Sequence, residues 1–155
     1  MKSYKTDKIS LKAIQAIYAA LIVGVVIAIV VFYFSVEQTI FVIDAANSKT
    51  ILVPVGAFFG LAINNFFFNR TVNAIDKDVD LQVKLAQYQT ANILRAALLE
   101  GPAFFAIFTF SNTGNIYFLM FAIALIIVMA FHFPTKEKFI DAFDLSFKEK
   151  SKLEH

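Results

Sequence analysis

Glu100 is the residue whose type and position most suggest chemistry in this chain. It is followed directly by Gly101 and Pro102, inside the apolar stretch RAALLEGPAFF, residues 95–105. An apolar environment favours the neutral form of a carboxyl group, so Glu100 can take up and release a proton near neutral pH. An ionisable group inside a membrane segment is by default a functional hypothesis, so Glu100 is a candidate for proton or cation handling.

A structural role explains the same residues. A neutral Glu100 that is hydrogen-bonded to Asn64 or Asn65 can fix the register of two helices. Arg95 is not the expected partner, because residues five apart lie about 140° apart around a helix. Arg95 is long enough to bring its charge to the membrane surface.

Further polar residues are expected at a depth similar to that of Glu100. The candidate polar site contains Glu100, Arg95, Asn64, Asn65, Gln15 and Tyr18, with His132 nearer the membrane surface. Pro102 has no N–H for the carbonyl of Leu98, so a helix bend is expected at Gly101 and Pro102. The freed carbonyl needs a partner inside a membrane, and together with the carboxyl group it can define a small hydrated pocket.

No residue pattern indicates an enzyme, a cofactor or a metal centre. The chain has no Cys and 2 His, and it contains no nucleotide-binding loop and no pairing of a nucleophile with a base. Asp76, Asp78 and Asp80 lack the glycine and the closing glutamate of a calcium loop. We therefore expect no catalytic residue, no metal and no cofactor. Nucleic-acid binding is not expected either, because the basic residues border apolar runs.

Four apolar runs predict an integral membrane protein. Hydrophobic residues make up 59% of the chain and charged residues 17%, more apolar than an ordinary soluble domain. The runs cover about residues 11–34, 51–68, 93–110 and 116–133. Each has the about 20 residues that a helix needs to cross a membrane. The predicted fold is an all-α, four-helix transmembrane bundle, one domain over residues 1–152. A soluble bundle of very apolar helices is the alternative, which solubility without detergent would establish.

The charges between the runs predict the orientation. Positive residues gather before the first run, between the second and third, and after the fourth: Lys2, Lys5, Lys8, Lys12, Arg70, Lys77, Lys84, Lys136, Lys138, Lys148, Lys150 and Lys152. The first connection has Lys49 against Glu37 and Asp44, and the third, SNTGN, has no charge. Because positive residues favour the cytoplasmic side, both termini are expected there, in a multi-pass protein of a bacterial inner membrane.

Two polar segments read as amphipathic helices on the cytoplasmic side. In residues 70–89, Ile75, Val79 and Val83 recur at four-residue steps, in a segment that can continue the second or the third membrane helix. In residues 135–150, Phe139 and Phe143 are followed at the same step by Phe147, which predicts a short helix on the membrane surface or, alternatively, against a partner. The terminal Leu153–His155 resembles the remnant of an expression tag.

Small residues predict where helices approach closely. Ala16, Ala20, Gly24 and Ala28 recur every fourth residue in the first run, and Gly56 and Gly60 have the same spacing in the second. Small side chains let helix backbones approach in a membrane, so these faces are expected to pack against neighbouring helices.

Two resemblances accompany this interpretation. The sequence around Glu100, with small residues before the acid and aromatic residues after it, resembles the carboxylate helix of rotary ATPase c subunits. That resemblance implies that Glu100 carries a proton or a sodium ion. The chain departs from those proteolipids in having 5 Gly in all and a long polar segment at residues 70–89. Over most of its length, through AQYQTANILRAALLEGPAFFAIF, TGN and PTKEKFI, it resembles uncharacterised small four-helix membrane proteins of Bacteroidetes-type bacteria. This second resemblance implies an inner-membrane location and supplies no mechanism.

The sequence supports two main functional hypotheses, and a third alternative is that Arg95 and the lysines bind a lipid headgroup or a partner. The first is a small inner-membrane protein with a buried polar cluster around Glu100, which associates with itself or assists a membrane complex. Its partners would be the lipid bilayer and a second copy or another membrane protein. The second is a proton- or cation-coupled transporter or channel that uses Glu100 as its titrating carboxylate.

Overall fold

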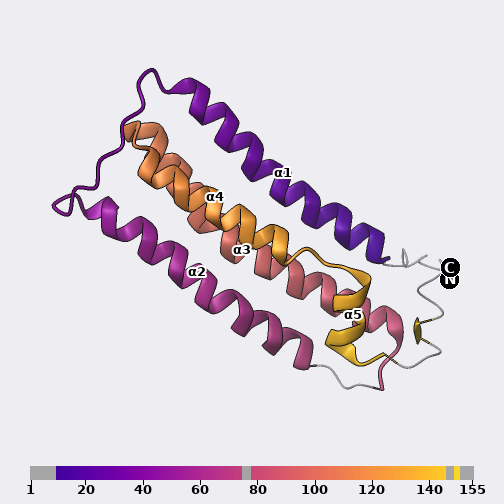
Figure 1. Cartoon of the computed structure of the whole chain (residues 1–155). Helices are drawn as coiled ribbons and strands as arrows, with labels where there is room; N and C mark the ends of the chain where they lie inside the picture. The colour runs from indigo at the N-terminus through magenta and orange to yellow at the C-terminus, as the bar shows by residue number, and fades with distance from the viewer. Residues whose placement is uncertain (1–9, 75–77, 146–148, 151–155) are drawn as a thin grey trace, which may run out of the picture.

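A computed structural model describes residues 10–74, 78–145 and 149–150 of the chain. These residues form an all-α protein with the helices α1 (Leu11–Ser35), α2 (Ser48–Asn73), α3 (Leu81–Thr113), α4 (Ile116–Phe131) and α5 (Lys136–Phe143) (Figure 1). Some expectations fall outside the described residues: those for Lys2, Lys5, Lys8, Lys77, Lys148, Lys152, Ile75, Asp76, Phe147 and the tag remnant Leu153–His155.

The long helices have the length and composition of membrane spans. In the described part of the chain, α1, α2 and α3 are each long and apolar enough to cross a membrane, and α4 with α5 makes a fourth if the pair is one span bent by 70°. Large apolar side chains such as Ile27, Phe58 and Phe108 are exposed on the outside of the bundle. So much exposed apolar surface is unusual for a water-soluble protein. These features are consistent with a multi-pass membrane protein.

The central helix of the bundle is α3, which packs against α1, α2 and α4. Its buried side chains run along its whole length, from Leu81 to Phe110. Its 33 residues make it the longest helix, and at about 1.5 Å per residue it exceeds the about 30 Å of a hydrocarbon core. The predicted third span, residues 93–110, is therefore only part of α3, and residues 81–92 extend the helix toward α5.

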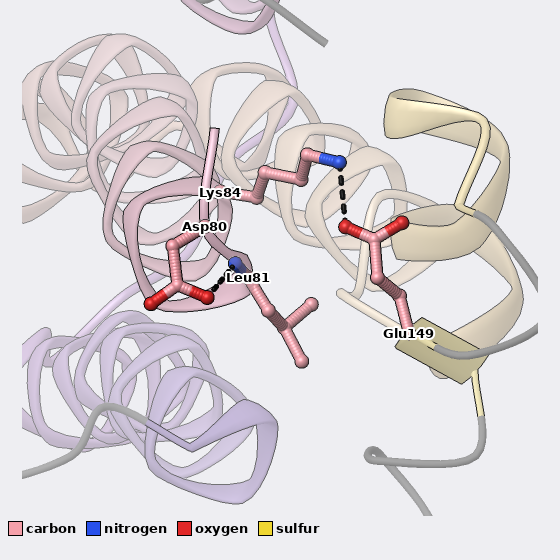
Figure 2. Close-up of polar contacts among 4 residues, drawn as sticks. All are labelled: Asp80, Leu81, Lys84 and Glu149. Carbon is pink, nitrogen blue, oxygen red and sulfur yellow. Dashed lines mark hydrogen bonds and ion pairs between the residues drawn. The ribbon is translucent and has the colours of Figure 1, made fainter. Parts of the chain in front are cut away.

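The polar segment at residues 70–89 is divided between two helices. Helix α2 continues to Asn73, and α3 begins at Leu81. The carboxylate of Asp80 accepts a hydrogen bond of 2.7 Å from the N–H of Leu81 and so caps α3, as Figure 2 shows. The segment thus continues both neighbouring membrane helices.

Helix α5 turns back and covers the beginning of α3. Thr135 caps it by accepting a hydrogen bond from the N–H of Lys138, and Asp144, at φ 48°, ends it. Phe139 is fully buried, with its ring centroid 5.0 Å from that of Tyr88 on α3. Phe143 packs on the same tyrosine. Phe139 and Phe143, from the apolar side of the helix predicted over residues 135–150, therefore lie on α3.

An ion pair joins the same end of α3 to the C-terminal segment. The ammonium group of Lys84 lies 2.7 Å from a carboxylate oxygen of Glu149 (Figure 2). The Lys84 side chain is 4% exposed and that of Glu149 21% exposed. Because a buried lysine needs a partner for its charge, this pair holds the segment against α3.

Each proline within a helix frees one carbonyl, and each freed carbonyl meets a neighbouring helix. Pro54 in α2 cannot bond to the carbonyl of Thr50, which accepts a hydrogen bond of 3.1 Å from the hydroxyl of Tyr117 on α4. Pro102 likewise frees the carbonyl of Leu98 in α3, and Gly60 of α2 lies against it. Helix α3 is continuous through Pro102.

The opposite end of the bundle is held together by the sequence Gly114-Asn115. Gly114 ends α3 at φ 66°, and a Cβ there would lie 2.5 Å from the carbonyl oxygen of Gln38, so no larger residue fits. The amide of Asn115 caps α4 and also accepts from the N–H and donates to the carbonyl of Val42. Backbone hydrogen bonds between Ile40 and its neighbours Gly114 and Ile116 complete the junction.

Candidate functional site

Arg95 is a nearly buried cation in the middle of α3. Its side chain is positioned by α2: Nη2 donates a hydrogen bond of 3.0 Å to Oδ1 of Asn65, and the guanidinium carbon lies 3.6 Å from the ring centroid of Phe68. Arg95 as a whole is 9% exposed, and its Nε has no hydrogen-bond partner. Among the described residues no carboxylate forms an ion pair with it, so its positive charge is not neutralised within that part of the protein.

Glu100 lies about a turn and a half further along α3 and is separate from Arg95. Its side chain is partly exposed, and no hydrogen bond or ion pair joins it to another residue in the described ranges. Its electrostatic neighbour is Tyr18 on α1. The expected hydrogen bond from Glu100 to Asn64 or Asn65 is not among the contacts observed.

The two asparagines have separate tasks. Asn65 binds Arg95, whereas the amide nitrogen of Asn64 bonds to the carbonyls of Gly60 and Leu61 within its own helix. Oδ1 of Asn64 is buried without a partner, as is Oδ1 of Asn92 on α3. Two acceptors and the Nε donor of Arg95 are thus buried and unsatisfied, a costly arrangement for polar atoms in an apolar interior.

The predicted residues of α1 connect it to the last turn of α4 and to the segment that follows. Nε2 of Gln15 donates to the carbonyl of Pro134 at 3.0 Å, and the hydroxyl of Tyr18 donates to the carbonyl of Met129 at 3.3 Å. Tyr18 is also an electrostatic neighbour of Arg95. Gln15 and Tyr18 therefore fix α1 against α4 beside the site, and the charged residue of the site is Arg95.

Lys138 and His132 are two further basic residues that interact electrostatically with Arg95. The site predicted from the sequence included His132, nearer the membrane surface, and did not include Lys138. The ammonium group of Lys138 bonds to the carbonyls of Phe131 and Phe133 at the end of α4, at 2.6 and 2.9 Å. Burial, and then the positive charge of Arg95, lower the pKa of Lys138. His132 bonds through Nδ1 to the carbonyl of Val128, and the positive charge of Arg95 acts on it as well. The sequence indicated a helix after Pro134, but nothing in it indicated that Lys138 would interact electrostatically with Arg95.

The small residues differ in what they touch. A Cβ on Gly60 would lie 2.7 Å from the carbonyl oxygen of Leu98 and 3.0 Å from Cγ of Pro102, so α2 and α3 are in close contact there. A Cβ on Gly24, Gly56 or Gly101 would meet no atom within 4 Å. In the stripe of α1, Ala16, Ala20 and Gly24 are exposed and Ala28 is partly buried, while larger residues such as Ile14, Tyr18 and Val25 face the bundle.

The fold and the site are those of a helical bundle with polar groups in its interior. The described residues contain no group of three or more His, Cys, Asp or Glu side chains that could hold a metal ion. What they do contain is a helical bundle of membrane-span dimensions with a buried arginine and a partly exposed carboxyl group in its central helix. Comparisons with protein-family models, with curated proteins and with solved structures find no match for the chain.

Proposed function

We propose that the chain is a four-span protein of the bacterial inner membrane, with both termini in the cytoplasm, that associates with itself through α3. The distribution of charge supports the orientation. Arg70, Lys84 and Lys138 lie toward the end of the bundle where α5 packs, whereas the other end has Lys49 against Glu37 and Asp44. Positive residues favour the cytoplasmic side of a membrane.

The observation that carries the proposal is the exposed strip around Glu100. Ile93, Ala97, Gly101, Phe104 and Phe108 are exposed along one side of α3 and form what we call the outer face of α3. Glu100 borders this face, beside Ala97 and Gly101 at the four-residue spacing that permits close approach of a second helix. A carboxyl group without a hydrogen-bond partner is costly in lipid.

A second copy of the chain supplies the hydrogen-bond partner that Glu100 lacks on this face. When two outer faces meet, each Glu100 finds a neutral carboxyl group across the interface, and Gly101 lets the backbones approach. Polar pairs of this kind contribute about 1–2 kcal/mol to the association of membrane helices. The proposal assigns the protein a role as a self-associating membrane component and assigns it no reaction.

Disulfide crosslinking in membranes tests the interface, because the natural chain contains no cysteine. Gly101→Cys places a thiol on the outer face of α3, and Gly24→Cys places one on the exposed stripe of α1. Neither position has an atom within 4 Å of a Cβ, so both substitutions fit the single chain and form a matched pair. After treatment with a membrane-permeable oxidant we expect a covalent dimer from Gly101→Cys and none from Gly24→Cys.

Two further results bear on the interface. Adding Glu100→Leu to the Gly101→Cys chain removes the polar pair and is expected to lower the dimer yield. Absence of a dimer from Gly101→Cys, or a larger yield from Gly24→Cys, would contradict association through α3.

Proton- or cation-coupled transport is the second candidate function, with Glu100 as the titrating carboxylate. It is favoured by the partial exposure of Glu100 on α3, together with the unsatisfied polar atoms of Asn64 on α2 and of Asn92 and Arg95 on α3. An ion pathway needs polar groups that can exchange partners.

Proteoliposomes distinguish the two functions. Transport requires an ion flux that Glu100→Gln abolishes while the variant keeps its helical content and its thermal stability. If the wild-type chain shows no flux, and Glu100→Gln alters only stability or dimer yield, transport is excluded and self-association stands. Labelling of Glu100 by a hydrophobic carbodiimide is a further check, since it requires a protonated carboxyl group that is open to lipid.

A further inference from the structure

An apolar groove lies between α2 and α4. It has a volume of about 150 Å³ and is lined by Ala57, Phe58 and Leu61 of α2 and by Phe121, Ala124, Leu125 and Val128 of α4. Every lining side chain is apolar, so the groove offers no hydrogen bond to a polar ligand. It suits a hydrocarbon chain.

The groove leads toward the basic groups around Arg95. Asn65 follows Leu61 by four residues on α2, and His132 follows Val128 by four residues on α4, so each continues its side of the groove one helical turn further. The guanidinium group of Arg95 reaches Asn65 from α3. The apolar groove is therefore followed, one helical turn further, by the residues around Arg95.

The charge at that end is not balanced by the described residues. Arg95 is 9% exposed, its Nε is unsatisfied, and its polar partner Asn65 is neutral. Lys138 and His132 lie within its field and add basic groups, and the electrostatic neighbours Tyr18 and Tyr88 are uncharged phenols at neutral pH. A buried cation without a counter-charge destabilises the protein, and an anion in contact with it would offset that cost.

We propose that the groove and the basic groups together bind one anionic phospholipid, with an acyl chain between α2 and α4 and the headgroup phosphate at Arg95 and Lys138. This combination favours a lipid over a free phosphate ion, because a phosphate alone would leave the adjoining apolar groove unused. Basic pockets between helices near the membrane surface have this ligand chemistry. The inference requires a membrane location and is independent of self-association through α3.

Binding can be measured with the purified full chain in a neutral detergent. Dioleoyl phosphatidylglycerol is added in increasing amounts, and bound lipid is counted by native mass spectrometry while the melting temperature is followed. Dioleoyl phosphatidylcholine and inorganic phosphate are the comparison ligands. We expect phosphatidylglycerol to bind at one site and to raise the melting temperature more than either comparison ligand does.

Variants assign the site. Arg95→Gln removes the buried charge and Ala124→Phe fills the groove from an exposed position, and each is expected to weaken phosphatidylglycerol binding by about tenfold or more. Arg70→Gln removes an exposed cation from the end of α2 and serves as the matched control, with unchanged binding expected.

Three results would overturn the proposal. The first is equal binding of phosphatidylcholine and phosphatidylglycerol, and the second is equal stabilisation by inorganic phosphate. The third is unchanged lipid affinity in Arg95→Gln. If that variant fails to fold, Lys138→Gln and Ala124→Phe decide, and unchanged affinity in both rejects the lipid site.

Discussion

Asn115 is a single side chain that holds two distant segments together. Its Oδ1 accepts from the N–H of Tyr117, which caps α4, and from the N–H of Val42 in the connection between α1 and α2. Its amide nitrogen donates to the carbonyl of Val42 at 2.6 Å. Replacing Asn115 by an aliphatic residue therefore removes both the cap of α4 and the hydrogen bonds to Val42 in the loop.

Asn115→Ala is expected to lower the free energy of unfolding by about 2–3 kcal/mol, the sum of a lost cap and of lost loop hydrogen bonds. Thermal unfolding in detergent, followed by circular dichroism, measures the change. Asn112→Ala is the control, because Asn112 is exposed and its amide bonds only to the carbonyl of Phe108 in its own helix. Equal melting temperatures for the two variants would contradict the role of Asn115.

Tyr117→Phe tests the carbonyl that Pro54 frees. Thr50 is 7% exposed, so loss of the hydroxyl leaves its carbonyl buried and unsatisfied. The expected cost is about 1–2 kcal/mol of unfolding free energy. In the control Tyr33→Phe, the altered tyrosine is 45% exposed and stacks on Phe110 through its ring, which phenylalanine retains. A loss of stability in Tyr33→Phe as large as in Tyr117→Phe would reject this account.

Residue types alone identified where the unusual polar groups are and left their partners undetermined. Arg95 and Glu100 stand out in an apolar run, and helical spacing argues correctly that they do not form an ion pair with each other. The partner of Arg95 comes from the other side of an interface, where Asn65 and its neighbour Asn64 are equally plausible by depth. Only the rotation of α2 about its axis, which the packing of Gly60 on α3 fixes, separates the two asparagines.

At the scale of the helices, the contact between α2 and α3 depends on Gly60. The absence of a side chain there lets the backbone of α2 rest on the carbonyl of Leu98 and on the ring of Pro102. Gly56, one turn earlier, has open space where a Cβ would be. Gly56 and Gly60 have the four-residue spacing of a packing motif, but only Gly60 is in contact with α3.

Gly60→Ala is expected to destabilise the protein by about 1–3 kcal/mol, because a Cβ 2.7 Å from a backbone oxygen forces the helices apart. Gly56→Ala is expected to be neutral or to stabilise by up to about 1 kcal/mol, since alanine favours a helix over glycine. The two melting temperatures, measured side by side in one detergent, provide the check. A destabilisation by Gly56→Ala as large as that by Gly60→Ala would refute the assigned contact.

The hydrophobic pattern of the sequence predicts which helices form better than it predicts where each helix begins and ends. The all-α class, the apolar helices and the helix after Pro134 agree with the sequence. The sequence places the third span at residues 93–110 because hydrophobicity ends at Asn92, yet α3 begins at Leu81. Its added turns are stabilised by α5 through Phe139 and by Glu149 through Lys84, contacts between segments far apart in the chain.

At the scale of the whole molecule, the bundle has two unlike ends. One end is closed by the turn at Gly114-Asn115 and by its hydrogen bonds to residues 40–42, and the other is closed by α5 and the basic residues around it. Two features set the α5 end apart: the Lys84–Glu149 ion pair and Lys138, whose ammonium group bonds to the carbonyls at the end of α4. If the positive residues determine orientation, the α5 end faces the cytoplasm.

Single cysteines at the two ends test this orientation, because the chain provides a cysteine-free background. Glu37→Cys lies in the loop after α1 and Asp141→Cys lies on the exposed side of α5, and both residues are exposed. In intact bacterial cells with a permeable outer membrane, an impermeant maleimide is expected to label Glu37→Cys and to leave Asp141→Cys unlabelled until the inner membrane is opened. The reverse pattern would invert the topology and move the proposed lipid site to the outer leaflet. Labelling of both cysteines in intact cells would place the two ends on one side and exclude a four-span bundle.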